Sequence, residues 1–76
     1  MKRFRFLKEV SVGQVVSFFS KSTHSFYKNV RVLENDDGIL YGINRDTKRH
    51  VNIFWNENIL DIILIKDVKK NFIRKN

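Results

Sequence analysis

The stretch "VRVLENDDGILYGI" (residues 30–43) consists of two short alternating runs separated by a polar turn. In both runs apolar side chains recur at every second position, which is the spacing of a half-buried strand. The turn "ENDDG" (residues 34–38) supplies Asn, Asp and Gly, which tolerate a positive φ. The stretch therefore predicts an antiparallel hairpin, and this hairpin sets the strand direction for the segments on either side.

Strands are also predicted toward both ends of the chain. In "RFRFL" (residues 3–7), Phe4 and Phe6 share one face and the arginines occupy the other. The segment "HVNIFW" (residues 50–55) alternates in the same way. The segment "ILDIILI" (residues 59–65) is apolar on both faces, which is typical of a strand with little exposure to water.

Short polar loops separate these strands. The segments "NRDTKR" (residues 44–49) and "NEN" (residues 56–58) fit hairpin loops, and "SKSTHS" (residues 20–25) is predicted as the longest loop. The 76 residues include no alanine and no proline and many Ile, Val and Phe, which favours strands over long helices. We therefore expect a mainly all-β fold, a small antiparallel barrel of five to six strands, because closing the sheet removes exposed strand edges.

The segment "SVGQVVSFFSKS" (residues 11–22) leaves two structures open. Its apolar residues fit a helical stripe, and Ser11 with Gln14 fits a capping box. Gly13 and the following β-branched and aromatic residues oppose a helix. We expect a turn around Gly13, followed by a strand that ends at Phe19.

Residues 1–67 are predicted to form a single domain, because a chain this short can hold only one small core. Residues 68–76 are predicted to form a basic C-terminal tail or a short helix. Asp67 can cap such a helix, and Val68 and Phe72 are spaced four residues apart. A helix of one or two turns and an extended tail are equally open.

The run "VRVLENDDGILYGINRDTKRHVNIFWNENILDII" (residues 30–63) gives a strand, an acidic turn, a strand with a glycine, an Asn/Asp turn, a strand and a closing strand. This order resembles that of small SH3-like and Sm-like β-barrel proteins over roughly residues 28–65. The resemblance implies an SH3-like or Sm-like barrel, and it places Gly42 at the mid-strand glycine that lets a bent strand curve. The loop "NRDTKRH" (residues 44–50) lacks the Asp-x-x-Met-Asn run that contacts uridine in Sm rings, so the resemblance does not extend to RNA binding by that site or to ring assembly with it.

The formal net charge of +7 is unevenly distributed. Residues 1–31 contain seven Lys or Arg and one Glu, and residues 66–76 contain five Lys or Arg and one Asp. Between them, residues 32–65 contain three Lys or Arg and six Asp or Glu. Basic ends of this kind attract polyanions or an acidic protein surface, although they also serve solubility alone.

Polyanion binding is the specific function that these residues favour. Lysine and arginine can neutralise phosphates, and exposed aromatic rings beside them can stack on unpaired bases. Phe26 and Tyr27 end a polar loop, so they are the aromatics that we expect to be exposed. The other large aromatics are expected in the core: Phe4, Phe6, Phe18, Phe19, Phe54 and Trp55. The candidate residues for binding nucleic acid or another partner are Lys2, Arg3, Arg5, Lys21, His24, Phe26, Tyr27, Lys28, Arg31, Arg45, Lys48 and Arg49.

The sequence does not favour an enzyme. Catalysis needs a nucleophile, a base and an orienting group that converge in a pocket, and His24 and His50 lie in polar, turn-like contexts. The chain has no cysteine, no glycine-rich phosphate loop and no short metal-ligand spacing, so we expect no catalytic residue, no cofactor and no metal. No apolar run approaches the ~20 residues of a membrane span, so we expect a cytoplasmic protein with no membrane partner.

A protein-interaction module or inhibitor is the alternative function. The doubly apolar strand at residues 59–65 has more apolar surface than a small interior can bury. Part of it can therefore contact an acidic or apolar face of a larger protein, or a second copy in a homo-oligomer. Small phage or plasmid proteins that bind a host enzyme often have this composition. Salt-dependent binding of RNA or DNA would favour the first function, and a stoichiometric protein partner that persists after nuclease treatment would favour the second.

Overall fold

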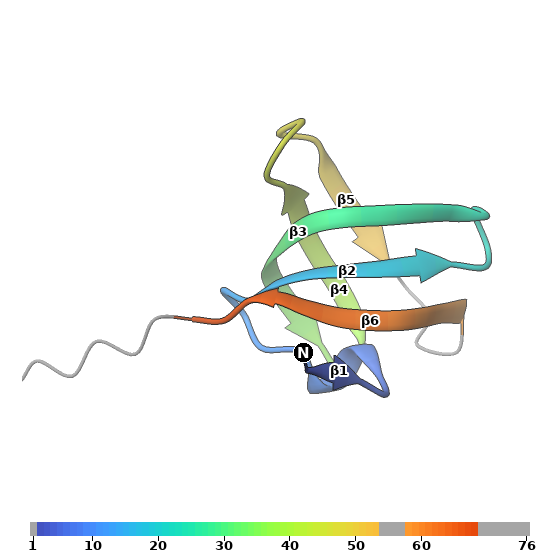
Figure 1. The fold of residues 1–76 in the computed structure, drawn as a ribbon, viewed down its shortest axis with the longest axis horizontal. Helices are drawn as coiled ribbons and strands as arrows, with labels where there is room; N and C mark the ends of the chain where they lie inside the picture. The colour runs from blue at the N-terminus through green and yellow to red at the C-terminus, as the bar shows by residue number, and fades with distance from the viewer. Residues whose placement is uncertain (1, 54–57, 69–76) are drawn as a thin grey trace, which may run out of the picture.

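The computed structural model describes residues 2–53 and 58–68, which form one antiparallel sheet of six strands in the order β1-β6-β2-β3-β4-β5 (Figure 1). The predicted all-β fold is confirmed. The two edge strands, β1 and β5, do not pair with each other in the described residues, so the sheet is curved but open. The elements are β1 (Arg3–Phe4), the 3-10 helix η1 (Leu7–Glu9), β2 (Val15–Ser20), β3 (Ser25–Asp36), β4 (Ile39–Asn44), β5 (His50–Ile53) and β6 (Ile59–Lys66).

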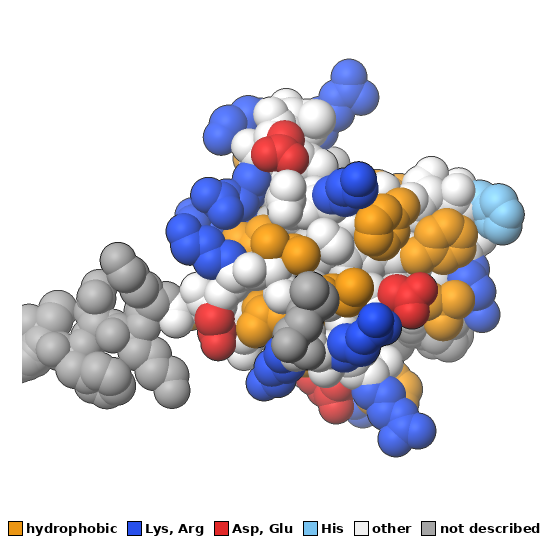
Figure 2. Space-filling view, viewed as in Figure 1, with side chains coloured by type: hydrophobic (Ala, Val, Ile, Leu, Met, Phe, Trp, Pro, Cys, Tyr) orange, Lys and Arg blue, Asp and Glu red, His pale blue; other side chains and the backbone are white. Residues whose placement is uncertain are grey.

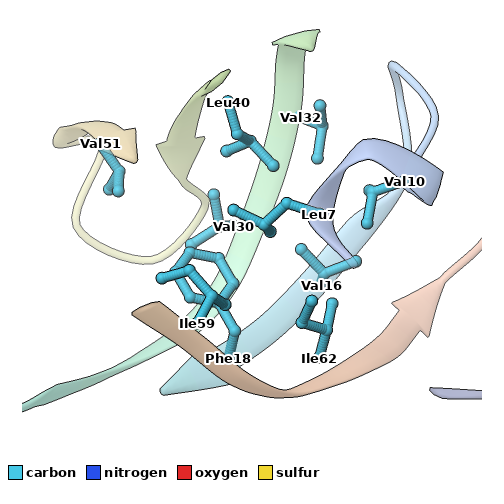
Figure 3. Packing of buried hydrophobic residues seen from close by; sticks show 10 residues of the cluster. All are labelled: Leu7, Val10, Val16, Phe18, Val30, Val32, Leu40, Val51, Ile59 and Ile62. Atoms are coloured by element: carbon cyan, nitrogen blue, oxygen red, sulfur yellow. The ribbon is translucent and has the colours of Figure 1, made fainter. Parts of the chain in front are cut away.

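The core lies on the inner side of this curved sheet, because alternate residues of each strand point inward. The buried side chains come from β2, β3, β4, β5 and β6 and from the segment around η1. Figure 3 shows them gathered with Leu7 near the centre. The cluster consists of Leu7, Val10, Val16, Phe18, Val30, Val32, Leu40, Val51, Ile59 and Ile62.

Irregular positions in the strands produce the curvature. The pairing of β2 with β3 shifts register between Val16 and Phe18, and Asn29 in the opposite strand has a φ of 53°. In β6, Asp61 has a φ of 54° where the pairing with β2 shifts again. An extra residue in one strand of a pair bends that strand and increases its twist. These bulges let a sheet of short strands wrap around the single core.

Gly42 lies where β4 approaches β3 most closely. A Cβ atom at this position would lie 2.6 Å from the carbonyl oxygen of Arg31 and 2.7 Å from Cγ1 of Val30. Both distances are shorter than real Cβ contacts, and the carbonyl oxygen belongs to the backbone of the paired strand. The position therefore requires glycine because of the close strand approach.

The N-terminal segment differs from the predicted strand over residues 3–7. Strand β1 ends at Phe4, because the Glu9 carboxylate accepts hydrogen bonds from the backbone N–H groups of Arg5 (2.9 Å) and Phe6 (3.2 Å) and starts η1. These two hydrogen bonds hold the pKa of Glu9 below its ordinary value. The alternation is broken, so the prediction that Phe6 is buried is wrong: its side chain is 42% exposed, and Leu7 is buried instead.

The strand interpretation of residues 11–22 is confirmed, since β2 begins at Val15 and follows a turn in which Gly13 has a φ of 95°. Ser11 and Gln14 do pair, but within this turn: the Ser11 N–H donates to Oε1 of Gln14 at 2.8 Å. The loop predicted over residues 20–25 is shorter, because β3 already begins at Ser25.

Some predictions concern residues that lie outside the described part of the chain. The predicted burial of Phe54 and Trp55 is among them, and so is the choice between helix and extended tail beyond Val68. The expected ends of the domain stay predictions.

Asn35, in the predicted turn, connects two parts of the fold. Its side-chain Nδ2 donates to the carbonyl oxygens of Leu7 (2.8 Å) and Val10 (2.6 Å), and its Oδ1 accepts from the N–H of Gly38 (3.0 Å). The same amide therefore closes the β3–β4 turn and holds the η1 segment, with its buried Leu7, against the sheet.

We expect Asn35→Ala to lower the free energy of unfolding by about 2 kcal/mol, because it leaves backbone groups without their partners. Urea unfolding followed by circular dichroism measures the change. Asn52→Ala is the matched control, because Asn52 is an exposed asparagine on β5 and should change stability by less than ~0.5 kcal/mol. Equal unfolding midpoints for the two variants would contradict this role of Asn35.

Candidate binding face

An apolar row crosses the outer side of the sheet on three neighbouring strands. Phe19 of β2 is paired with Phe26 of β3 on one side and with Leu60 of β6 on the other. Because Phe18 and Ser20 are buried on the inner side, strand alternation turns Phe19 outward. We call these three residues, Leu60, Phe19 and Phe26, the apolar row.

The apolar row is open to solvent at both ends. Phe26 is 50% exposed and Leu60 is 45% exposed, and Phe19 between them is half-buried. Figure 2 shows hydrophobic side chains gathered on this face beside a histidine at the end of the β2–β3 hairpin, with Lys or Arg and Asp or Glu side chains around them. The prediction that Phe19 belongs to the core is wrong. Phe18 and Ser20, the residues before and after it, are buried on the inner side, so the Phe19 side chain points outward.

Polar groups of the β2–β3 hairpin flank the aromatic rings. The Nζ of Lys28 lies 5.9 Å from the ring centroid of Phe26, and the ring of His24 meets that of Phe19 edge-on at 5.8 Å. Lys21 is exposed in the same turn. The hairpin therefore places an exposed ring next to a cation on a pair of hydrogen-bonded strands.

Tyr27 is the exception among the predicted hairpin residues. It points to the inner side, where its ring lies 5.4 Å from that of Phe18 and packs against the core. Its hydroxyl shares a hydrogen bond with Oγ1 of Thr23, in the β2–β3 turn, at 3.2 Å. The expected exposure of Tyr27 is therefore wrong, because β3 starts earlier than predicted and alternation sends Phe26 and Tyr27 to opposite sides.

The three cations predicted to bind a partner in the N-terminal segment, Lys2, Arg3 and Arg5, have different surroundings. Arg3 forms an ion pair with Asp61 of β6, at 3.7 Å, and both side chains are about two-thirds exposed. A pair this exposed contributes little to stability. Lys2 has its Nζ 5.2 Å from the ring centroid of Phe4, and Arg5 is exposed in the bend before η1.

The β4–β5 loop carries Arg45, Lys48 and Arg49, all exposed. Hydrogen bonds fasten this loop to the bulge of β3: the side chain of Asn44 donates to the carbonyl oxygen of Lys28 (3.0 Å), and the side chain of Asn29 donates to Asp46 (2.9 Å). The loop cations are therefore brought to the part of β3 that carries Lys28.

Two further cations, Arg31 and Lys66, lie beside the start of β2, at the end of this strand that is far from the apolar row. Val15 is paired with Arg31 of β3 and with Lys66 of β6, and both of these side chains are exposed. The cations border a shallow hollow, which is also lined by Gly13, Val15, Asp67 and Val68. Arg31 was predicted as a binding residue, whereas Lys66 was not.

Sequence reasoning missed three members of this face: Phe19, Leu60 and Lys66. The available signal was the doubly apolar strand at residues 59–65, which implied that some of its apolar side chains remain exposed. The partner strands of that segment could not be named from the sequence.

The fold and this face define a small, open antiparallel β protein with an exposed apolar row bordered by cations. No protein-family model, curated protein or solved structure was found to match the chain.

Within residues 2–53 and 58–68, no three His, Cys, Asp or Glu side chains gather where they could hold a metal ion. In the same part of the chain, no helix has the length and apolar character that a membrane crossing requires.

Proposed function

We propose that this protein binds single-stranded RNA or DNA on the outer side of strands β6, β2 and β3. The single observation that carries the proposal is the Phe26 ring, which is 50% exposed on a sheet face and has the Lys28 ammonium 5.9 Å from its centroid. An unpaired base can stack on such a ring while the ammonium group neutralises the adjoining phosphate.

The energetics favour this arrangement. Stacking of a base on an aromatic side chain contributes ~1–3 kcal/mol, and it is available to every base because each has a π-face. Phe26 lies in a paired strand, so its position is fixed before binding and little conformational entropy is lost. The net charge of +7 adds long-range attraction for a polyanion.

The resemblance to SH3-like and Sm-like barrels stays a proposal, and it favours the same function, because small barrels of these kinds often bind RNA or DNA. We propose a cytoplasmic protein that acts by binding alone, without catalysis, cofactor or metal.

A titration of fluorescently labelled oligonucleotides tests the proposal. Single-stranded DNA, single-stranded RNA and duplex DNA are titrated with the protein, and anisotropy is recorded from low to physiological salt. We expect micromolar binding of the single strands, with a plot of log K against log salt whose slope is about −2 to −3, since each phosphate contact on a single strand contributes about −0.7. Absence of binding at low salt, or equal binding of the duplex, would contradict stacking on unpaired bases.

A second candidate function is docking on another protein, and the exposure of β6 favours it. Leu60 is 45% exposed and Ile65 is 48% exposed, so this strand presents apolar side chains to water. Such residues can contact an acidic or apolar face of a larger protein, or a second copy of this chain. Affinity capture after nuclease treatment tests this function: one stoichiometric protein supports it, and recovery of nucleic acid alone in untreated samples contradicts it.

A further inference from the structure

The outer side of β2 leads from the apolar row to Arg31 and Lys66. Phe19, Ser17 and Val15 occupy alternate positions on this side, but only Phe19 is partly exposed, since Ser17 is 6% and Val15 1% exposed beneath flanking side chains. Four residues of strand separate Phe19 from Val15, which corresponds to about 13 Å. A nucleic acid bound at the apolar row would therefore cross the side chains that flank Ser17 and Val15 to reach the other end of β2.

The two cations at the end of this route are well placed for a phosphate. Arg31 and Lys66 occupy the strands on either side of Val15, so that they border the hollow from both sides. In the described part of the chain neither side chain forms an ion pair. Arginine with its planar fork and lysine with its point charge are the residues that proteins use to bind phosphate oxygens.

Asp67 also lines the hollow, and its carboxylate accepts hydrogen bonds from two neutral donors. Its Oδ1 accepts hydrogen bonds from Nε2 of Gln14 at 2.9 Å and from the N–H of Val68 at 2.7 Å. With two cations and one carboxylate, the formal charge around the hollow remains positive.

We propose that Arg31 and Lys66 hold a backbone phosphate of the same single strand whose base stacks on Phe26, so that the strand runs along the outer side of β2. This inference rests on the proposed nucleic-acid binding and adds the direction and length of the site. A stacked strand carries one phosphate per ~3.4 Å, so the ~13 Å between the apolar row and the hollow accommodates up to about four nucleotides.

The length of the oligonucleotide separates this inference from the proposed function. A thymidine dinucleotide reaches only the apolar row, whereas a hexanucleotide spans both sites. Each is titrated into the wild type and the double variant Arg31→Ala/Lys66→Ala, with amide chemical shifts as the readout. The control is Lys8→Ala, which removes a positive charge from the exposed N-terminal segment, away from the outer side of β2.

We expect Arg31→Ala/Lys66→Ala to weaken hexanucleotide binding by about tenfold. The slope of log K against log salt should become shallower by about 0.7, the value for one phosphate contact on a single strand. Dinucleotide binding should change less than twofold, and the control should retain most of the hexanucleotide affinity. An unchanged hexanucleotide affinity, or an equal loss in the control or with the dinucleotide, would overturn the route along β2 and leave stacking on Phe26 intact. Failure of the wild type to bind either oligonucleotide would overturn the proposed function itself.

Discussion

Phe26→Ala is expected to weaken the binding of a short single-stranded oligonucleotide by about 10- to 100-fold. The substitution removes one stacking platform, and base stacking on an aromatic side chain contributes ~1–3 kcal/mol. Because half of the Phe26 side chain is already exposed, its removal should leave the fold intact. Anisotropy titrations at one fixed salt concentration measure the affinity, and urea unfolding checks that stability is retained.

Phe6→Ala is the matched control for Phe26→Ala. Phe6 is 42% exposed, and the Nζ of Lys8 lies 5.7 Å from its ring centroid, so it too is an exposed ring beside a lysine. It differs in position, since it precedes η1 and is not part of the apolar row. A loss confined to Phe26→Ala supports the binding face on β6, β2 and β3. Equal losses in both variants would show that the protein binds through exposed rings without regard to their position.

Gly42→Ala is expected to lower the free energy of unfolding by about 3 kcal/mol. An added Cβ would lie 2.6 Å from the Arg31 carbonyl oxygen, so β3 and β4 would have to separate where they pair. Overpacking of this kind costs about 1–3 kcal/mol, and the upper end applies here because one clashing atom belongs to the backbone. A domain of this size has only ~4–11 kcal/mol in total, so the loss is large.

The sign of the change in the free energy of unfolding distinguishes a crowded from an open position at Gly42. In a strand with free space beside it, alanine would increase stability by about 0.4–1 kcal/mol, because it reduces the entropy of the unfolded chain. Adding Val30→Ala to the variant should not restore stability, because it removes the contact with Val30 and leaves the contact with the Arg31 carbonyl. The urea midpoint reports both results. A Gly42→Ala protein at least as stable as the wild type would contradict the close approach of the two strands.

The central hairpin and the class of fold could be predicted because they depend on local patterns. Alternating apolar residues and an Asn-Asp-Asp-Gly turn indicated β3 and β4, and a short run that is apolar on both faces indicated β6. These signals extend over a few residues and do not require knowledge of partner strands.

The predictions that were wrong depended on contacts that the pattern does not contain. The pattern "RFRFL" suggested burial of Phe6, but the Glu9 carboxylate ends the strand and turns Leu7 inward. The polar residues before Phe26 correctly indicated a loop, which spans residues 21–24, but Tyr27 was expected to be exposed at its end. Because β3 begins at Ser25, where it pairs with Ser20, Tyr27 lies within the strand and packs against the core.

The apolar row was beyond sequence reasoning for a further reason. It requires the register between β2 and β6, which joins Phe19 to Leu60 across some forty residues of chain. Register over such a separation is set by packing of the whole core and by bulges at positions such as Asp61. The hydrogen bonds from Asn35 to Leu7 and Val10 could not be predicted either. Asparagine is common in turns, so its presence there did not point to a second role.

The most direct test of the account is a titration of the isotopically labelled protein with a single-stranded oligonucleotide, observed through its amide resonances at low salt. The account predicts saturable shifts concentrated on Phe19, Phe26, Lys28 and Leu60, with smaller changes at Arg31 and Lys66 and few at η1. Absence of shifts with both DNA and RNA, or shifts that cluster around η1 and leave β2 and β3 unchanged, would contradict it.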